Sequence, residues 1–371
     1  MTDYEKICDF ANLYRAYRRS RLGKRGKLTV AKFEANLLEN LNLLSEELRS
    51  GTYRPQPYHV FYVHEPKTRL IMANAFRDKI VQHSLCDNVL EPALKRSLIL
   101  ENFAVQAGKG THFALNRLRD DMRSYFFSRK AANDAERRSA SLPPLPTHLG
   151  GYADGWALKA DVSKYFYSVP HAPLKAQLRR RVADEKALRL IDMIIDTCDD
   201  PGIPMGNQTS QWFAIAFLSG LDHFVKERLR VKHYGRYMDD IYLIHDDKEY
   251  LRRCRMEIER YLEGLGLKLN QKTHIFPLRN GIDFCGFHSY VTDTGKIVRK
   301  VRKASKERAK RKMRGQKKKL DAGEIELSDA EKSYGSWRSH ASHGNSYYLI
   351  RSADALFKNI FKESKRKWRN E

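Results

Sequence analysis

Two adjacent carboxylates, Asp239 and Asp240, follow Tyr237-Met238 within the stretch 234–244. Apolar and aromatic residues flank the pair, and the alternation over 241–244 predicts a strand, so we expect the acids at a tight turn between two short strands. Adjacent negative charges repel each other, and Mg²⁺ is commonly held by one or two carboxylates together with substrate phosphates. The pair is therefore a candidate metal site, with a solvated acidic turn as the alternative.

A third carboxylate, Asp161, ends the apolar stretch that begins at Ala157. A two-metal phosphoryl-transfer site needs a carboxylate from another strand, because adjacent side chains on one turn cannot surround both ions. Phe166 follows five residues later, where its ring could form the floor under a bound sugar; a core aromatic is the alternative.

Asp161 with Phe166, and the stretch 237–240, resemble the two catalytic palm motifs of reverse transcriptases in order and separation. Further stretches resemble other motifs of that family: the fingers motifs at 66–69 (Pro66-Lys67-Thr68-Arg69) and 76–79, the loop and helix start under the incoming nucleotide and template at 202–211, the motif whose lysine approaches the triphosphate at 266–273, and the primer-grip hairpin at 282–287. The resemblance covers roughly residues 50 to 290.

This resemblance implies an α+β fold, the right-hand polymerase fold, with fingers, a palm of antiparallel sheet plus helices, and a short helical thumb. The subdomains would be a basic helical N-terminal extension at 1–50, fingers at 51–154 with an inserted loop at about 128–151, a catalytic palm at 155–290 and a basic thumb at 291–371. The implied activity is that of an RNA-directed DNA polymerase, acting on an RNA template, a DNA primer or RNA–DNA hybrid, and dNTPs.

The resemblance also assigns roles to residues. Asp161, Asp239 and Asp240, with the Val162 carbonyl, would hold two Mg²⁺ ions, for which Mn²⁺ could substitute, and Lys272 would act as general acid toward pyrophosphate unless it is only a surface lysine. The implied dNTP-binding residues are Lys67, Arg69, Phe166, Met205, Gln211 and Met238. The implied primer grip is Phe284, Cys285, Gly286 and Phe287. The candidates for nucleic-acid backbone contact are Lys109, Arg299, Lys300, Arg302, Lys303, Lys310 and Arg311.

The motif at 202–211 carries a subfamily signal. Group II intron and retroviral enzymes usually have Gln before its second glycine and end it in Ser-Pro, whereas here Met205 precedes Gly206 and the motif ends in Ser210-Gln211. This form resembles reverse transcriptases of diversity-generating retroelements, which implies error-prone copying of a template-repeat RNA and a small basic accessory protein. Some bacterial defence-associated reverse transcriptases, which copy a structured noncoding RNA, share parts of the pattern. An inactive, maturase-like RNA-binding protein is the alternative from another class.

Composition agrees with a nucleic-acid partner. The formal net charge of +24 favours polyanion binding that weakens with salt, although structural RNA-binding proteins share this property. The five cysteines are scattered and odd in number, without a Cys-x-x-Cys pair, so we expect neither a disulfide framework nor a zinc site. The absence of an 18-residue apolar run and of a signal-peptide pattern predicts a cytoplasmic protein without a membrane span.

Hydrophobic periodicity predicts the elements that position these residues. Residues 1 to about 50 are expected to be helical and 58–63 to form a strand. Further helices are expected over about 78–90, 179–195 and 210–229, and a helix polar on all sides within 296–319. His112, His340 and His343 are too dispersed in sequence to indicate a metal site.

Overall fold

A computed structural model of the chain describes residues 1–64 and 67–362. The chain divides into two compact units, one formed by residues 1–110, 160–242 and 252–274, the other by 111–159, 243–251 and the residues from 275 onward. These units group residues by contact and do not follow the subdomain boundaries expected from the sequence, which stay predictions. The mixture of helices and antiparallel strands confirms the predicted α+β class.

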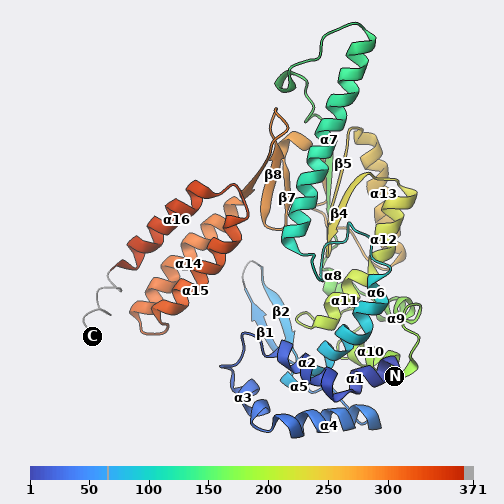
Figure 1. Cartoon of the computed structure of the whole chain (residues 1–371), viewed down its shortest axis with the longest axis vertical. Coiled ribbons are helices and arrows are strands. Elements are labelled where there is room, and N and C mark those ends of the chain that lie inside the picture. The colour runs from blue at the N-terminus through green and yellow to red at the C-terminus, as the bar shows by residue number, and fades with distance from the viewer. Residues whose placement is uncertain (65–66, 363–371) are drawn as a thin grey trace. The chain divides into compact units, whose positions relative to one another are not determined.

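The N-terminal fifty residues are helical, as predicted. They form α1 (Asp3–Cys8), α2 (Phe10–Ser20), α3 (Leu28–Ala35) and α4 (Leu37–Ser50) (Figure 1). Thr2 and Glu5 form a capping box at the start of α1, which satisfies backbone donors that a helix start leaves without partners. Gly51 ends α4 with a φ of 75°, a conformation that glycine adopts without steric strain.

The next segment of the first unit is a hairpin followed by helix. β1 (His59–Val63) pairs antiparallel with β2 (Arg69–Ala73), which confirms the expected strand. The helix expected over 78–90 is present as α5 (Phe76–Leu85) and a π-helical turn η1 (Cys86–Leu90), and α6 (Glu91–Lys95) follows.

The later helices of the first unit are shorter than the periodicity predicted. They are α8 (Tyr165–Ser168), α9 (His171–Arg179), α10 (Glu185–Ile195), α11 (Gln208–Phe217), α12 (Ser219–His223) and the π-helical η3 (Phe224–Arg228). The single helix expected over 179–195 is wrong, because Asp184 caps a new helix by accepting hydrogen bonds from the backbone N–H groups of Lys186 and Ala187. The helix expected over 210–229 begins earlier and is interrupted at Leu218.

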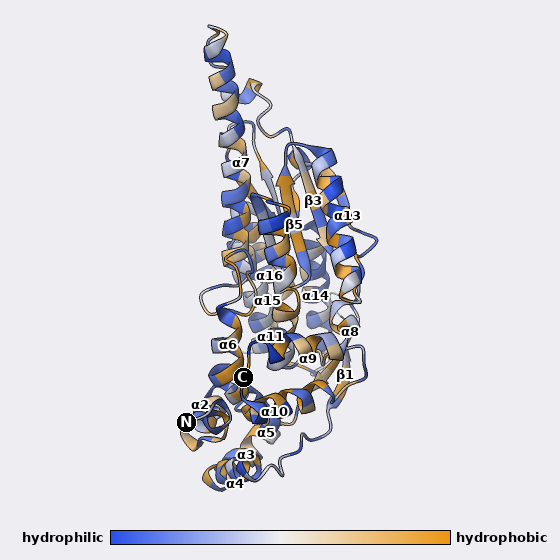
Figure 2. Cartoon of the chain, turned by 90° about the vertical axis from the view of Figure 1, so that its right-hand side faces the viewer, coloured by the Kyte–Doolittle hydropathy of each residue, from blue (hydrophilic) through white to orange (hydrophobic). Residues whose placement is uncertain are grey.

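A four-stranded sheet has the strand order β4-β5-β3-β6. Its strands are β3 (Trp156–Asp161), β4 (His233–Tyr237), β5 (Asp240–His245) and β6 (His274–Pro277), and α13 (Lys248–Gly264) follows β5. Residues 241–244 of β5 are at most 1% exposed, and the strand is among the most apolar segments of the chain (Figure 2). Four consecutive buried residues indicate a strand covered on both faces, whereas a half-buried strand alternates.

The second unit contains α7 (Thr111–Ser139), a three-stranded antiparallel sheet and three C-terminal helices (Figure 1). The strands are β7 (Ile282–Phe284), β8 (Phe287–Val291) and β9 (Ile297–Val301); the helices are α14 (Lys303–Asp321), α15 (Leu327–Ser342) and α16 (Tyr347–Ile360). Short 3-10 turns occur at η2 (Thr147–Leu149) and η4 (Leu278–Asn280).

Two sequence expectations fail in this unit. The inserted loop expected at 128–151 is wrong for its first half, because α7 continues to Ser139 and supports itself with an ion pair between Lys130 and Asp134, one helical turn apart. The basic segment is not a helix polar on all sides: it begins as β9, and α14 buries Ala309 and Met313 in a cluster with α15 and α16.

Histidines far apart in sequence lie close together in this unit, with the rings of His112 and His343 centred 3.5 Å apart. Burial and the charges of His112 and His343 lower the pKa of His340, which places all three near one another.

No helix in the described ranges combines the length and apolar character that crossing a bilayer requires.

Candidate active site

The acidic pair lies where β4 turns into β5, as expected. Met238 and Asp239 form the turn, and Asp240 is the first residue of β5, so only one of the two acids belongs to the turn itself. Met238 has a φ of 57°, a left-handed conformation that is uncommon outside glycine. Arg236 donates a hydrogen bond from Nη1 to the Met238 carbonyl oxygen at 2.7 Å, and this bond stabilises the left-handed backbone conformation of Met238.

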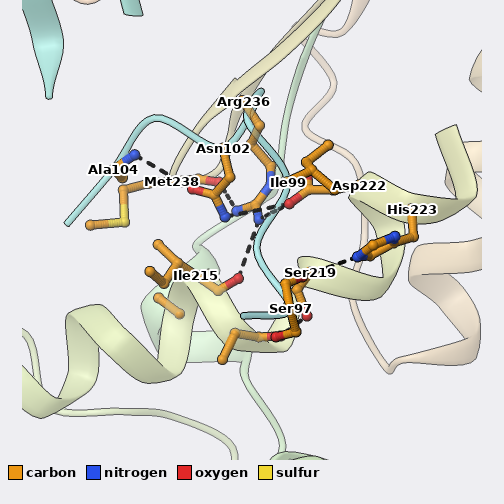
Figure 3. A network of polar contacts seen from close by, with 12 residues as sticks. Ser97, Ile99, Asn102, Ala104, Ile215, Ser219, Asp222, His223, Arg236 and Met238 are labelled. Carbon is orange, nitrogen blue, oxygen red and sulfur yellow. Dashed lines mark hydrogen bonds and ion pairs between the residues drawn. The ribbon is translucent and has the colours of Figure 1, made fainter. Parts of the chain in front are cut away.

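Arg236 belongs to a buried polar network under the turn (Figure 3). Its Nε and Nη2 donate to the two carboxylate oxygens of Asp222 at 2.6 and 2.5 Å, and both side chains are 0% exposed. Tyr234 donates its hydroxyl to Asp222 at 2.6 Å, and Asn102 donates its side-chain N–H at 3.4 Å. Burial by itself lowers the pKa of Arg236, but the adjacent Asp222 carboxylate outweighs it and raises the pKa overall. The Arg236 guanidinium therefore stays protonated.

Asp161 ends β3, the neighbour of β5 in the sheet. Asn270 donates from Nδ2 to Asp161 Oδ2 at 3.1 Å, and the Asn270 backbone N–H donates to the Asp161 carbonyl at 2.7 Å. Val162, whose carbonyl is a predicted metal ligand, forms an antiparallel bridge with Leu269 and is 1% exposed. The segment at 268–270 therefore orients the Asp161 carboxylate from both backbone and side chain.

Lys272 lies in the turn after Asn270. Its backbone N–H donates to Asn270 Oδ1 at 3.0 Å, and its side chain is exposed. Asn270 thus links the predicted general acid to the predicted metal ligand Asp161. Asn270 lies within the motif at 266–273, and this place in the motif is the signal in the sequence that points to it.

Asp239 lies near the segment that carries Phe166. Burial raises the pKa of Tyr165, and the negative charge of Asp239 contributes to the shift, as does that of Asp222. The half-buried ring of Phe166 meets that of Tyr165 edge-on, with centroids 5.9 Å apart. The backbone carbonyl of Phe166 accepts a hydrogen bond from Ile203 at 2.7 Å, so the Phe166 segment is joined to the loop that carries Met205.

That loop is joined in turn to the β1–β2 hairpin. The Met205 carbonyl accepts a hydrogen bond from the Met72 backbone N–H at 2.9 Å, and the Leu70 backbone N–H donates to the Tyr167 hydroxyl at 3.2 Å. The predicted triphosphate-binding cations Lys67 and Arg69 are exposed on the same hairpin, and Gln211 is exposed on the first turns of α11. Pro66, part of the resembling fingers motif, lies outside the described residues.

The predicted primer-grip hairpin is present in the second unit. Cys285 and Gly286 form the two-residue turn between β7 and β8 with φ values of 46° and 87°, as a tight hairpin turn with two left-handed residues requires. Phe284 and Phe287 are 1% and 0% exposed, so their rings pack in the interior. Burial raises the pKa of the Cys285 thiol to about 12. Any primer contact by this hairpin is therefore left to its turn, and that contact stays a prediction.

Two of the predicted phosphate-binding cations serve the fold. Lys109 donates from Nζ to the carbonyls of Ile99, Leu100 and Asn102 at 3.2, 3.2 and 2.9 Å, and burial lowers its pKa. Arg299 donates from Nη2 to the Leu115 carbonyl at 2.6 Å, and burial lowers its pKa too. The remaining candidates are exposed on β9, on α14 or between them: Lys300, Arg302, Lys303, Lys310 and Arg311.

The donor chemistry of the three aspartates suits a hard divalent ion, because Mg²⁺ prefers carboxylate oxygen. Within residues 1–64 and 67–362, no group of three or more His, Cys, Asp or Glu side chains is arranged so that it could hold a metal ion. The convergence of Asp161, Asp239 and Asp240 on metal ions is therefore a proposal and not an observation.

The chain is similar to one curated protein and to solved structures. The E. coli (strain K12) protein YkfC is 24% identical over 298 residues, which cover 68% of this chain and 72% of YkfC. Two solved structures are also similar, each at low identity: apo telomerase from Candida tropicalis, truncated from its C-terminal domain (TM-score 0.42, 14% identity, 70% of this chain), and telomerase from Candida albicans in complex with a TWJ fragment of telomeric RNA (TM-score 0.46, 12% identity, 84% of this chain).

The chain spans 60% and 58% of the lengths of those two telomerase chains. Residues 68–289 match the family model described as reverse transcriptase (RNA-dependent DNA polymerase). This match covers more than half of the chain and includes Asp161, Asp239 and Asp240. The chain therefore belongs to the reverse transcriptase family of RNA-directed DNA polymerases.

Proposed function

We propose that the chain extends a primer on an RNA template by two-metal phosphoryl transfer at Asp161, Asp239 and Asp240. The observation that carries this proposal is that separate hydrogen bonds support the acids on two neighbouring strands. Asn270 holds the Asp161 carboxylate at 3.1 Å, and Arg236 holds the turn that precedes Asp240 through the Met238 carbonyl. Carboxylates held in place in this way would position the divalent ions that neutralise negative charge in the transition state, because catalysis of phosphoryl transfer depends on positioning and charge neutralisation.

When bound, two Mg²⁺ ions would lower the pKa of the primer 3′-hydroxyl and neutralise negative charge on the triphosphate. The three carboxylates would hold the ions, with the Val162 carbonyl as a further oxygen ligand. Lys67 and Arg69 would neutralise the triphosphate, and a guanidinium can bind two phosphate oxygens at once. Lys272 would give a proton to the leaving pyrophosphate. Phe166 would exclude a ribose 2′-hydroxyl and so select dNTPs.

The test is primer extension on an RNA template with dNTPs and Mg²⁺. Wild type should extend, and the Asp239→Ala/Asp240→Ala variant should not. Asp293→Ala is the matched control, since it removes a carboxylate exposed on a turn of the second unit. Extension by the double variant at the wild-type rate would refute the catalytic role of the pair. If no protein extends, the assay is repeated with the native RNA, and a second failure would favour the RNA-binding alternative.

For the biological role, we propose error-prone copying of a template-repeat RNA, as in diversity-generating retroelements, with a small basic accessory protein as partner. Met205, at the position before Gly206, supports this assignment. Met205→Gln should lower misincorporation opposite template adenine, measured by sequencing the extension products. An unchanged error spectrum would contradict it. Antiviral defence through copying of a noncoding RNA is the competing role. A variable target gene with repeats beside this gene in the genome would decide against the defence role.

A further inference from the structure

A cavity of about 370 Å³ lies wholly within the first unit, in a part of the molecule to which no sequence motif assigns a function. Its walls come from the start of α1, from the end of α4 with the turn that follows, and from α10, which pack together in this unit (Figure 1). None of the residues named above for catalysis, dNTP binding, primer contact or backbone contact lines it. The cavity is therefore separate from the candidate active site.

The floor of the cavity is apolar. Leu48 and Leu190, from α4 and α10, are 0% and 4% exposed. Tyr53 is also buried, and its hydroxyl already donates a hydrogen bond to Asp78 Oδ1 at 2.8 Å. The floor thus offers aliphatic and aromatic surface that a hydrocarbon group could cover.

Four exposed cations line the same cavity. They are Arg49, Arg54, Lys186 and Arg189. Within residues 1–64 and 67–362, none of the four forms an ion pair with an acidic side chain, and no Asp or Glu lines the cavity. Burial raises the pKa of the Cys8 thiol to about 11, and the charges of Arg49 and Lys186 oppose this shift, which places these two cations near one thiol. An anionic ligand would relieve the repulsion between such cations.

The sequence of α10 gives one of its faces both characters. Lys186, Arg189 and Met193 follow one another at the spacing i, i+3 and i+7, which brings them to the same side of the helix. The buried residues Leu188 and Ile191 lie on the opposite side. Met193 is half-buried, and the flexible thioether of methionine adapts to apolar partners of different shape. This face of α10 therefore suits a ligand that is both anionic and apolar.

Hydrogen bonds join the three walls. The Tyr4 hydroxyl donates to the Leu48 carbonyl at 2.7 Å, which connects α1 to α4. The Tyr4 backbone N–H donates to Asp184 Oδ2 at 2.8 Å, and Asp184 caps α10. The cavity is thus formed in the absence of a ligand, and a preorganised site loses less conformational entropy on binding than one that must be ordered.

We propose that this cavity docks an acidic segment of a partner protein, with an aliphatic side chain on the floor and flanking Asp or Glu side chains paired with the four cations. The volume is near the lower end of the range of ligand pockets, about 300–1,000 Å³, and suits a single anchoring side chain. Such a partner differs from the small basic accessory protein, which the four cations would repel.

The lining favours a peptide over an unpaired nucleotide. Sequence-specific recognition of an unpaired base uses stacking together with hydrogen bonds to the edges of the base. The hydroxyls of Tyr4 and Tyr53 are both already bonded within the protein, and the other floor residues are aliphatic. The floor therefore has no free polar side chain for the edge of a base, whereas aliphatic surface is what a leucine side chain would contact.

The test is fluorescence anisotropy with short labelled peptides, measured on the full chain without primer, template or Mg²⁺. One peptide has a central Leu flanked on both sides by Asp and Glu; a second has Ser in place of the Leu. Wild type should bind the leucine peptide about tenfold more tightly, because burial of a leucine side chain stabilises a complex to this extent. Equal binding of the two peptides, or no binding of the leucine peptide, would overturn the proposal.

Charge reversal locates the contact. Arg49→Glu/Arg189→Glu should remove binding of the leucine peptide, and Met193→Glu should do so from the apolar side of the same face. Arg228→Glu/Arg255→Glu is the matched control, since both arginines are exposed in the first unit, lie outside the cavity and change the net charge equally. Melting curves check that each variant folds. Equal losses in the cavity and control variants would overturn the proposal, because net charge alone would then explain binding.

A final arm tests the nucleic-acid occupant. A short labelled oligouridylate should bind wild type and Arg49→Glu/Arg189→Glu no differently than it binds the control variant, after the shared change in net charge. Loss of oligouridylate binding that is specific to the cavity variant, together with weak binding of the leucine peptide, would reassign the cavity to RNA and overturn the peptide proposal. Because no primer extension is involved, the result does not depend on the proposed chemistry at the three aspartates.

Discussion

Removing the counterion of Arg236 tests the role of the buried network most directly. Asp222→Asn keeps the size of the side chain but leaves the guanidinium without its negative partner, and both residues are 0% exposed. Breaking a buried pair in this way leaves an uncompensated charge and destabilises proteins by about 3–5 kcal/mol. That is a large share of a native stability of about 5–15 kcal/mol.

The measurement is the thermal unfolding midpoint. A loss of this size should lower the midpoint on the order of 10 °C, since each kcal/mol corresponds to about 2–4 °C for domains of 150–250 residues. Asp120→Asn is the matched control. Asp120 pairs with Arg119 at 2.9 Å, but the two side chains are 48% and 49% exposed, and such surface pairs contribute about 0–1 kcal/mol.

A triple variant separates stability from positioning. Asp222→Leu/Arg236→Met/Tyr234→Phe removes the charges and the tyrosine hydroxyl that would lose its acceptor, and apolar replacement of a buried pair is often neutral or stabilising. It should regain most of the lost stability, but it still lacks the Arg236 donor to the Met238 carbonyl. Primer extension should therefore stay well below wild type. An unchanged midpoint in Asp222→Asn, or full extension by the triple variant, would refute the reasoning.

Three further predictions follow from the site. Asn270→Ala removes the donor to Asp161 Oδ2 and should raise the Mg²⁺ concentration for half-maximal extension by about tenfold, as loss of an outer-shell partner typically does; an unchanged Mg²⁺ titration would count against the role. Phe166→Ala should incorporate rNTPs more readily relative to dNTPs in single-nucleotide extension, and an unaltered ratio would exclude Phe166 as the sugar discriminator. Folding lowers the pKa of His83 from 6.5 to about 4, so the unfolded chain binds more protons than the folded chain between these pH values. The free energy of unfolding should therefore decrease as the pH falls from about 6.5 to about 4. His83→Gln should flatten this pH dependence in denaturant titrations, and an identical slope in both proteins would contradict the prediction.

Elements with a strong local pattern were predictable. The helices of the first fifty residues, the strand β1 and the hairpin around Met238 follow from periodicity and turn chemistry that neighbouring residues carry. However, a local pattern that continues across the end of a helix does not reveal that the helix ends there. The apolar repeat across 179–195 continues through the residues where the chain leaves α9, and only the capping bonds of Asp184 begin α10.

The candidate site shows the same limit. Asp161, Asp239 and Asp240 are recognisable because their motifs are local. Asn270, in contrast, is 109 residues from Asp161, and nothing in either segment predicts that one side chain bonds the other. Arg236 and Asp222 are 14 residues apart, and their pairing requires that the turn and the helix α12 be brought together first.

The sequence by itself determined the family, the acidic motifs and the class of partner, because reactive residue types at short spacings and an excess of 24 positive charges are properties of the chain alone. Only the tertiary structure decided which groups support the acids and which cations are occupied by backbone carbonyls. These outcomes depend on burial and on contacts between distant segments. Such contacts form because the whole apolar surface is buried at once, and no short window of residues contains that information.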